Sequence, residues 1–401
     1  MRAPRNAKAP ASVEIDPRAA RAILRGHPWV WRDAVRKAPS SLGLGEPVVV
    51  RARDIPFVGY ALWDPASPIA LRIYARTPQE PFGIDTIAHG IERAAALRDE
   101  LFEDGTTSAY RVCNGEGDRV PGVVIDRYET AAIVRLDGEA IGAWKEPLIE
   151  AIWRILRPRG IDGVGLRGTG RTPSVETVAG RPLPPTIEVV EHGMRMRVDL
   201  AHGQKTGAFL DQRENRRRVR ELSRGRRVLN LFSYAGGFSC AAALGGATHV
   251  TSVDLAQGAH AAAQKSFELN GLRAADHAFV TADAFAWLEQ AARRGQVFDL
   301  VISDPPSFAP NEKSAGRALG AYRKLHQACA AVTAPGGILC AASCSSHVDM
   351  ESFLETLDDD ALGAERFVMC GAWGPPEDHP TPAAWAEGRY LKFVALRDRS
   401  R

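Results

Sequence analysis

The sequence predicts an α/β protein that ends in a doubly wound, mostly parallel sheet, with a small β-rich module and an α+β module before it. Three observations support this fold class. From residue 228 onward, five apolar runs of strand length alternate with helical stretches, which implies right-handed crossovers. A glycine pair follows the first run, and aspartates close the next three. Short aromatic strands between Pro and Gly turns fill the chain from Ser12 to about Ile73,.

Composition and charge are those of an ordinary globular protein with two basic zones. The 401 residues suffice for two or three domains, and 45% are hydrophobic and 25% charged,. The net charge is only +3. However, residues 1–53 carry eleven Lys and Arg against four acidic residues, and residues 204–227 carry nine against three. Such zones suggest a polyanionic partner, although a solvated surface explains either zone alone equally well.

The chain shows no signal for export or for a membrane span. Its start, MRAPRNAKAP, is basic and lacks an apolar core,. The uncharged stretch 327–348 contains Pro335-Gly336-Gly337, so we expect a helix, a turn and a strand there,. The six cysteines are scattered and do not form a disulfide framework,. We therefore expect a cytoplasmic protein with reduced thiols and no membrane partner.

Residues 1–80 form the first predicted domain, a small β-barrel. A flexible tail over residues 1–11 precedes a short helix from Pro17 to Leu24. Trp29 and Trp31 are expected to pack against the barrel, and the alternative is that one of them stacks on a nucleic-acid base. The expected strands are EPVVVRA, FVGYALW and IALRIYA.

Residues 81–185 form the second predicted domain, a compact α+β unit. Its boundary lies at Gln79-Glu80-Pro81. An amphipathic helix over 84–103, hairpin strands from AYRVCN to AAIVRL, a helix over about 142–156 and the strand GVGLRG follow,. The segment RPLPP is a linker. No catalytic cluster is visible in this stretch.

Residues 186–401 form the third predicted domain. It opens with a hairpin that turns at His192-Gly193,. The segment from Gln204 can fold over the rim of the sheet as a lid, and Asp211 is expected to cap the next helix. The arginines of that helix either contact phosphate or solvate the helix face. At the C-terminus, FVMCGAW and RYLKFVALRD are expected to add an antiparallel edge hairpin.

A candidate binding rim lies at the carboxyl ends of the parallel strands, where open α/β sheets bind ligands. VLNLFSYAGG reads as strand, tight turn and helix start, and Gly236 lets the backbone approach a ligand,. Asp254 closes the next strand and can accept hydrogen bonds from a ribose diol. Asp283 and Asp304 end two more strands. One such aspartate is more often a helix cap, but the ordered set favours a ligand site.

Two further strand ends carry chemistry. In DPPSF, Pro305 and Pro306 fix an extended turn whose carbonyls can grip a planar base, and Phe308 can stack on it,. In SCSS, Cys344 ends the fifth strand, across the cleft from Asp304. The alternative for Cys344 is a buried strand cysteine, the fate expected of Cys340. The pattern Cys340, Cys344, His347 lacks a second ligand pair, so no metal is predicted.

Several segments then carry a specific resemblance. They are KTGAFLDQRENR, VLNLFSYAGGFS, SVD at 252–254, FDLVISDPPSF and SCSS. Together they resemble the RlmI-type family, S-adenosylmethionine-dependent methyltransferases of 23S ribosomal RNA that make 5-methylcytosine. The likeness covers nearly the whole chain. It implies a PUA-like RNA-binding domain, a central α+β domain, and a class I (Rossmann-like) methyltransferase sheet.

The resemblance also implies residue roles. Cys344 would add to carbon 6 of cytosine, and Asp304 would hold the amino edge and ring nitrogen 3 of the base. Asp254 would take the ribose hydroxyls of S-adenosylmethionine, and Asp283 its adenine amino group. The full set expected at the cofactor is Phe232, Ser233, Gly236, Asp254, Asp283, Asp304, Gln212 and Lys205. The set expected at the substrate is Pro305, Pro306, Phe308 and Arg213.

Two other functions stay open at this point. A guanine or adenine N-methyltransferase could use DPPSF alone, because a ring nitrogen attacks a methyl group without help from a thiol. A non-catalytic RNA-binding assembly factor could keep the same fold. SCSS favours carbon methylation, while Ser307 stands where many RNA 5-methylcytosine enzymes carry a second cysteine that helps release product. The expected partner is RNA, 23S rRNA in particular, and a homodimer stays open.

Overall fold

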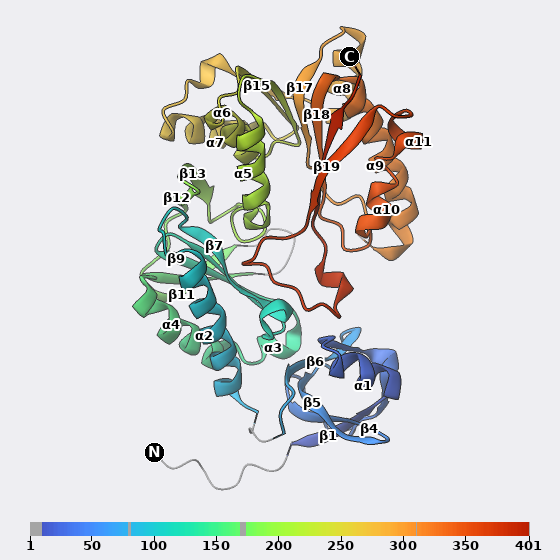
Figure 1. The fold of residues 1–401 in the computed structure, drawn as a ribbon. Coiled ribbons are helices and arrows are strands. Elements are labelled where there is room, and N and C mark those ends of the chain that lie inside the picture. Colours follow the sequence, from blue (N-terminus) through green and yellow to red (C-terminus); the bar gives the residue numbers. More distant parts are fainter. Residues whose placement is uncertain (1–9, 79–81, 169–173, 310, 401) are drawn as a thin grey trace.

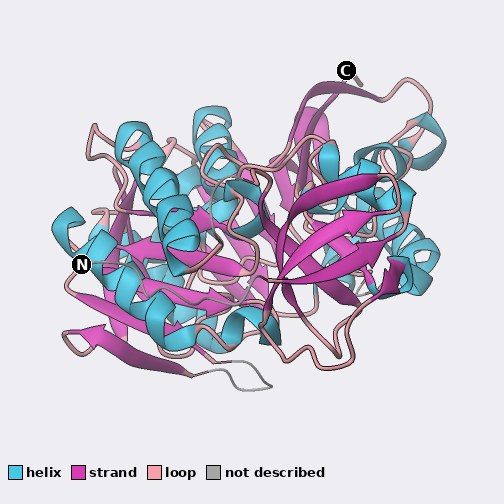
Figure 2. Cartoon of the chain, turned by 90° about the horizontal axis from the view of Figure 1, so that it is seen from below, coloured by secondary structure: helices cyan, strands magenta, loops and turns pink. Residues whose placement is uncertain are grey.

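The computed structural model describes residues 10–78, 82–168, 174–309 and 311–400. Three larger sheets and one hairpin follow one another along the chain (Figure 1). Viewed from below, helices flank the strands (Figure 2). Within the described ranges, the structure contains no helix that is both long and apolar enough to cross a membrane. The predicted division into residues 1–80, 81–185 and 186–401 stays a prediction.

The first module is a six-stranded sheet around one apolar cluster. Its helix α1 (Pro17–Leu24) begins where predicted, because the Asp16 carboxylate accepts a hydrogen bond from the Arg18 amide at 2.7 Å,. The predicted tail ends one residue earlier than expected, since a strand begins at Ala11, and residues 1–9 lie outside the described ranges. In the order in which they pair, the strands are β2 (Trp29–Trp31), β6 (Ile69–Ala75), β5 (Ile55–Trp63), β4 (Pro47–Ala52), β1 (Ala11–Ile15) and β3 (Val35–Lys37).

The second module places two long helices on a five-stranded sheet. α2 (Ile84–Leu101) and α4 (Lys145–Leu156) pack their apolar faces against it, and α3 (Glu139–Gly142) is short. The predicted boundary at residues 79–81 lies outside the described ranges. The strands, in pairing order, are β11 (Val175–Gly180), β10 (Gly163–Arg167), β9 (Ala131–Leu136), β8 (Val123–Tyr128) and β7 (Ala109–Asn114).

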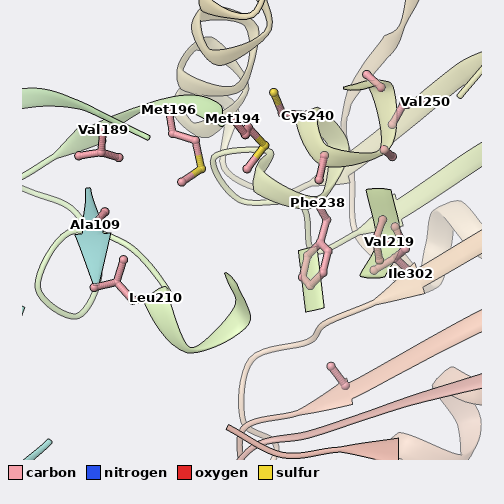
Figure 3. Close-up of a cluster of buried hydrophobic side chains, with 14 of the residues drawn as sticks. Ala109, Val189, Met194, Met196, Leu210, Val219, Phe238, Cys240, Val250 and Ile302 are labelled. Atoms are coloured by element: carbon pink, nitrogen blue, oxygen red, sulfur yellow. The ribbon is translucent and has the colours of Figure 1, made fainter. Parts of the chain in front are cut away.

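A two-stranded hairpin then leads to the third module. β12 (Thr186–Glu191) and β13 (Met194–Asp199) pair antiparallel around the predicted turn. In β13 the buried residues alternate with exposed arginines,. Figure 3 shows Met194 and Met196 on the side of Phe238 and Cys240, two residues of α6 (Gly237–Leu244). The hairpin therefore extends the core of the large sheet.

The third module is the predicted doubly wound sheet, and it is confirmed. Its pairing order is β16-β15-β14-β17-β18-β20-β19, with β14 to β18 parallel and β20 antiparallel to both its neighbours. The strands are β14 (Arg227–Leu231), β15 (His249–Asp254), β16 (Ala278–Thr281), β17 (Phe298–Ser303), β18 (Thr333–Ser343), β19 (Phe367–Trp373) and β20 (Lys392–Asp398). The helices are α5 (Arg213–Leu222), α6 (Gly237–Leu244), α7 (Gln257–Leu269), α8 (Ala284–Arg293), α9 (Ala315–Ala331), α10 (Met350–Leu354) and α11 (Asp359–Leu362).

The strand order reverses between β14 and β17. The chain first builds outward through β15 and β16, and then returns to place β17 on the other side of β14. Leu231 pairs with Ser303, and Ser303 with Ala341, so the carboxyl ends of these strands meet at one edge. Open α/β sheets bind ligands at such a switch point.

The segment 374–391 between β19 and β20, called the connecting segment below, was not predicted. It descends from the large sheet past the second module towards the first (Figure 1, dark red). Asn114 donates to the Pro380 carbonyl at 2.9 Å, and the Trp385 ring lies 5.0 Å from that of Trp29. The predicted terminal hairpin is thus confirmed, but its connection contacts all three modules.

Candidate active site

The turn after β14 is held in a strained backbone. Phe232, Tyr234 and Gly236 have φ angles of 56°, 45° and 73°, and two of these residues are not glycine,. The Tyr234 amide donates to Asp254 Oδ2 at 2.8 Å, which fixes the turn to the end of β15. A Cβ on Gly236 would lie 2.5 Å from the Ala263 Cβ. Glycine is required here by the φ angle and by the packing of α6 on α7.

The two aspartates after β14 have different surroundings. Asp254 accepts amide hydrogen bonds from Tyr234 and Ala256, one on each oxygen, and each oxygen keeps a lone pair,. Asp283 does not end its strand as predicted, because β16 stops at Thr281. It is the N-cap of α8, and its Oδ1 accepts from the Ala286 amide at 2.9 Å. One oxygen of Asp283 therefore caps a helix, which was the alternative to a ligand contact.

Two exposed apolar side chains flank these carboxylates, and the sequence interpretation missed both. Leu255 is 69% exposed and Phe285 is 37% exposed. Each follows an aspartate of the rim by one or two residues. Large apolar side chains exposed beside carboxylates are typical of a ligand surface. The signal was present in the sequence for Leu255, an apolar residue directly after the last acid of a strand.

Asp304 lies at the centre of the rim, just after β17. Its carboxyl group is hydrogen-bonded by Gln212, a buried residue that precedes α5. Burial, with the negative charge of Asp211 second, raises the pKa of Asp304 to about 7, against the opposing charge of Lys205,. Near neutral pH this carboxyl group therefore exists in both protonation states.

Asp211 does not cap α5 as predicted. It is buried, and its Oδ2 accepts from Lys205 Nζ at 2.6 Å and from the Tyr390 hydroxyl at 2.7 Å. Although burial acts in the opposite direction, the Lys205 charge and hydrogen bonds hold the pKa of Asp211 below its ordinary value. Gln212 occupies the cap position without a side-chain bond to a backbone amide, and its Oε1 accepts from Asn215 Nδ2 of the helix at 2.6 Å. Lys205 and Gln212 thus lie at the rim because Lys205 binds Asp211 and Gln212 binds Asp304.

Cys344 follows β18 directly and is half-buried. Burial raises its pKa, and the charges of Asp304 and Asp211 act in the same direction, whereas Lys205 and Lys392 act in the opposite one. Asp304 therefore lies close enough to Cys344 for its charge to raise the pKa of the thiol. Cys340 lies four residues before Cys344, within β18. It is fully buried, as expected of a structural cysteine.

The DPPSF loop and the SCSS loop are in direct contact. Ser345 Oγ donates to the Ala309 carbonyl at 3.3 Å, and the Tyr322 hydroxyl bonds Ser343 Oγ at 3.0 Å. Pro305 is buried and Pro306 is exposed. The Phe308 ring is half-buried and packs on Tyr322, with ring centroids 4.9 Å apart. The two rings are tilted at 50° to each other, so in this structure Phe308 packs against Tyr322 without stacking on it.

The arginines of α5 include two that are neither solvated nor free for phosphate. Arg213 is 2% exposed and donates to both oxygens of Asp378, at 2.9 and 2.8 Å. Arg216 makes the same kind of pair with Glu191 at 2.5 Å. The guanidinium groups of Arg213 and Arg216 are therefore both paired with buried carboxylates. The prediction that Arg213 contacts the substrate is thus not supported by its position.

Comparisons with known proteins agree with this geometry. Residues 166–384 match the family described as S-adenosylmethionine-dependent methyltransferase, and residues 13–76 match a PUA-like domain. The chain belongs to the S-adenosylmethionine-dependent methyltransferase family. The methyltransferase is 37% identical over 416 residues to the ribosomal RNA large subunit methyltransferase of Deinococcus radiodurans, covering 99% of this chain and 100% of the relative. It is 34% identical over 384 residues to the ribosomal RNA large subunit methyltransferase I of Erwinia tasmaniensis, covering 94% and 96%.

Solved structures share the whole fold of the methyltransferase. A methyltransferase complexed with SAH has a TM-score of 0.86 at 24% identity, over 96% of this chain and 100% of that one. A SAM-dependent methyltransferase from Streptococcus mutans has a TM-score of 0.84 at 23% identity, over the same shares. The predicted fold class and the first module's PUA-like character are thereby confirmed.

The residues at the rim fit S-adenosylmethionine. Ser233 Oγ and Asp211 Oδ1 are buried and have no hydrogen-bond partner within the described ranges. Buried polar atoms normally have partners, so both are available to a ligand. Leu255 offers an exposed apolar surface beside the free lone pairs of Asp254. Among the described residues, no group of three or more His, Cys, Asp or Glu is arranged to hold a metal ion.

Proposed function

We propose that this methyltransferase makes 5-methylcytosine in the RNA of the large ribosomal subunit, with Cys344 as the nucleophile. The observation that supports the proposal is that the charge of Asp304 acts on the Cys344 thiol, next to a hydrogen bond from Ser345 to the Ala309 carbonyl just after DPPSF. A thiol and a carboxyl group at one rim are what methylation of a pyrimidine carbon requires, because carbon 5 is a poor nucleophile until a thiolate has added at carbon 6.

The substrate class rests on relatives and on charge. The curated relatives cover nearly the whole chain, and their names specify large-subunit ribosomal RNA. The PUA-like module, residues 13–76, holds most of the basic zone of residues 1–53, and Arg25 and Lys37 are exposed there. Positive charge of this kind neutralises phosphates and contributes affinity that is independent of sequence. A cytosine inside a helix cannot be reached, so the target lies in a loop or is flipped out.

S-adenosylmethionine, when bound, supplies a methyl group made electrophilic by its sulfonium charge. The Cys344 thiolate forms a bond to carbon 6 of cytosine while Asp304 gives a proton to ring nitrogen 3. The electron pair displaced from the 5,6 double bond makes carbon 5 nucleophilic towards the methyl group. Once carbon 5 carries the methyl, its proton leaves to a base or water, the carbon 6–sulfur bond breaks, and the proton on nitrogen 3 returns to Asp304.

Asp304 suits this role because its pKa of about 7 lets it hold and release a proton near neutral pH,. Its neighbour Asp211 stays charged, since Lys205 pairs with it. Two carboxyl groups in different protonation states are the usual sign of divided acid and base work. We also propose Pro305 and Pro306 as the frame that holds Asp304 against the base.

The cofactor roles are part of the same proposal. Asp254 accepts hydrogen bonds from the ribose hydroxyls with its remaining lone pairs. Asp283 accepts one from the adenine amino group with the oxygen that does not bind the Ala286 amide. Leu255 packs against the adenine ring. The remaining proposed contacts come from the backbone and side chains of Phe232, Ser233, Gly236, Gln212, Lys205 and Asp304.

The test replaces Cys344 by alanine and identifies the methylated nucleoside. Large-subunit rRNA and labelled S-adenosylmethionine are incubated with each protein, and the RNA is hydrolysed to nucleosides. We expect labelled 5-methylcytidine with the wild type and none with Cys344→Ala, while titration calorimetry still shows cofactor binding. Cys370→Ala is the matched control, because that thiol is exposed on β19 and distant in sequence from the rim.

Other outcomes identify the competing functions. A labelled methylguanosine or methyladenosine that persists in Cys344→Ala would support an N-methyltransferase. RNA binding without cofactor binding would support an assembly factor. Either result contradicts the proposal.

A further inference from the structure

Lys392 is a buried lysine that the reaction above does not use. It is the first residue of β20 and pairs in register with Ser343, the residue before Cys344. Lys392 is only 1% exposed. A lysine is rarely buried to this extent unless its charge is compensated.

The ammonium group is surrounded by backbone oxygens. Lys392 Nζ donates to the carbonyls of Ser345 at 2.5 Å, Val348 at 2.6 Å and Tyr390 at 2.8 Å. These three bonds use all three donors of an ammonium group. Two of the acceptors lie in the turn after Cys344, so Lys392 holds that turn to the start of β20.

No carboxylate pairs with this cation within the described ranges. The nearest acid that acts on it is Asp349, which is exposed and whose Oδ1 accepts from the Ser352 amide at 2.8 Å. A buried charge without a counter-ion destabilises a fold. The other group whose negative form favours the Lys392 charge is Cys344, and it acts more strongly than Asp349.

The charges that face Cys344 explain why such a cation is useful there. Asp304 and Asp211 oppose a thiolate, while Lys205 and Lys392 favour it. Lys205 is already paired with Asp211 at 2.6 Å. The hydroxyls of Tyr390 and Tyr322 also lie within reach of the thiol's charge. Of the two lysines, Lys392 is the one whose charge is not cancelled by an acid.

We propose that Lys392 is the positioning residue of the nucleophile, fixing the turn after Cys344 and serving as the counter-charge of its thiolate. The proposal deepens the proposed function, since it rests on Cys344 being the nucleophile. It is supported by the burial that lowers the pKa of Lys392 to about 8, which is the direction expected of a cation that lacks a permanent partner,.

The test measures the rate of alkylation at Cys344 in the full-length chain at pH 7. Iodoacetamide reacts with the thiolate, and mass spectrometry of the peptide that contains Cys344 gives the rate at that thiol alone. The background carries Cys370→Ser, which removes the exposed thiol. Three variants are compared with this background: Lys392→Met removes charge and donors, Lys392→Gln keeps donors without charge, and Lys392→Arg keeps both.

At pH 7 Lys392 is charged, because its pKa is about 8. At this pH we expect the alkylation rate at Cys344 to fall about tenfold in Lys392→Met and Lys392→Gln, and to stay near its starting value in Lys392→Arg. If Lys392→Met does not fold, the Gln and Arg variants decide the question alone. A Gln variant with an unchanged rate at pH 7 would reduce Lys392 to a backbone clamp and overturn the proposal.

This measurement uses no RNA and no methyl transfer, so it is independent of the proposed function. A slower rate at pH 7 in the uncharged variants together with full methylation by Cys344→Ala would mean that the Lys392 charge acts on a thiol that is not the nucleophile. An unchanged rate with inactive Cys344→Ala would overturn only the role of Lys392.

Discussion

At the scale of single residues, the rim is defined by two carboxyl groups that differ in protonation. The pKa of Asp304 is raised to about 7, and that of Asp211 is lowered. The difference arises because Lys205 and Tyr390 both bind Asp211, whereas Asp304 receives one bond from Gln212. Asp211 in turn makes ionisation of Asp304 less favourable.

This arrangement predicts that Asp304→Asn stabilises the protein at alkaline pH. The folded-state pKa of Asp304 lies above its ordinary value of 3.8. The folded state therefore binds this proton more tightly, and the stability it contributes is complete below pH 4 and lost as pH rises towards 7. Because asparagine does not ionise, the Asp304→Asn variant does not lose this stability as the pH rises. We expect the free energy of unfolding of the variant to exceed that of the wild type by about 1–3 kcal/mol at pH 8, and not to exceed it at pH 4.

Urea unfolding at both pH values checks this expectation. Asp299→Asn is the comparison, because Asp299 is half-buried near the start of the same strand and its carboxylate accepts from the Arg227 amide. A stabilisation of Asp304→Asn that is equal at pH 4 and pH 8 would be inconsistent with a raised pKa.

Much of the rim could be predicted because its residues follow apolar strands directly. Asp254, Asp304 and Cys344 are each the last residue of a strand or the next one along the chain. Asp211 was misassigned because a local pattern suggested a cap, whereas its partner Tyr390 is 179 residues away. Lys392 was missed for the same reason, since its acceptors lie 44 and 47 residues before it.

At the scale of elements, the connecting segment joins the second and third modules through one buried residue, Asp378. Asp378 is fully buried, and it accepts from Arg213 and from the Arg111 amide, while its own carbonyl accepts from Arg98. The proximity of His379 and Arg213 holds the pKa of Asp378 well below its usual range, against the effect of burial. The segment is therefore fixed by charge as well as by packing.

Removing one partner of this pair should be strongly destabilising. In Arg213→Met the Asp378 carboxylate stays buried without its guanidinium, which costs about 3–5 kcal/mol. Arg217→Met is the matched control on the same helix, because Arg217 is half-exposed and pairs only at the surface; its expected cost is below about 1 kcal/mol,. Thermal unfolding followed by circular dichroism compares the two. Equal melting temperatures would show that the Arg213–Asp378 pair does not stabilise the segment.

The elements themselves differ in how well the sequence predicted them. The alternating strands and helices after residue 228 were predicted because parallel strands are apolar throughout,. β1, β3 and β11 were not, because they are short or half-exposed and carry few apolar residues. The connecting segment has no periodic pattern, and its course depends on tertiary contacts alone.

At the scale of the whole molecule, the PUA-like module places positive charge at the end opposite the C-terminus (Figure 1). Arg25 and Lys37 are exposed there. If this surface neutralises RNA phosphates, its removal should weaken binding evenly across RNA sequences. We expect Arg25→Gln combined with Lys37→Gln to reduce the slope of log affinity against log salt by about 1 to 2.

Fluorescence titration with an rRNA fragment at several salt concentrations gives this slope. Arg397→Gln is the control, since Arg397 is exposed at the far end of β20. A reduction of the same size in the control would point to a diffuse effect of net charge. The predicted cytoplasmic location stays a prediction, and a homodimer stays open.

The central claim is a covalent bond between Cys344 and a cytosine. An rRNA fragment that carries 5-fluorocytidine tests it most directly, because fluorine at carbon 5 cannot leave as a proton and the enzyme stays attached after methyl transfer. With S-adenosylmethionine present, the account predicts a denaturant-resistant protein–RNA complex whose cross-linked peptide contains Cys344, and no such complex with Cys344→Ser. A wild-type protein that methylates rRNA but never forms the complex, or that forms it through another residue, would contradict the account.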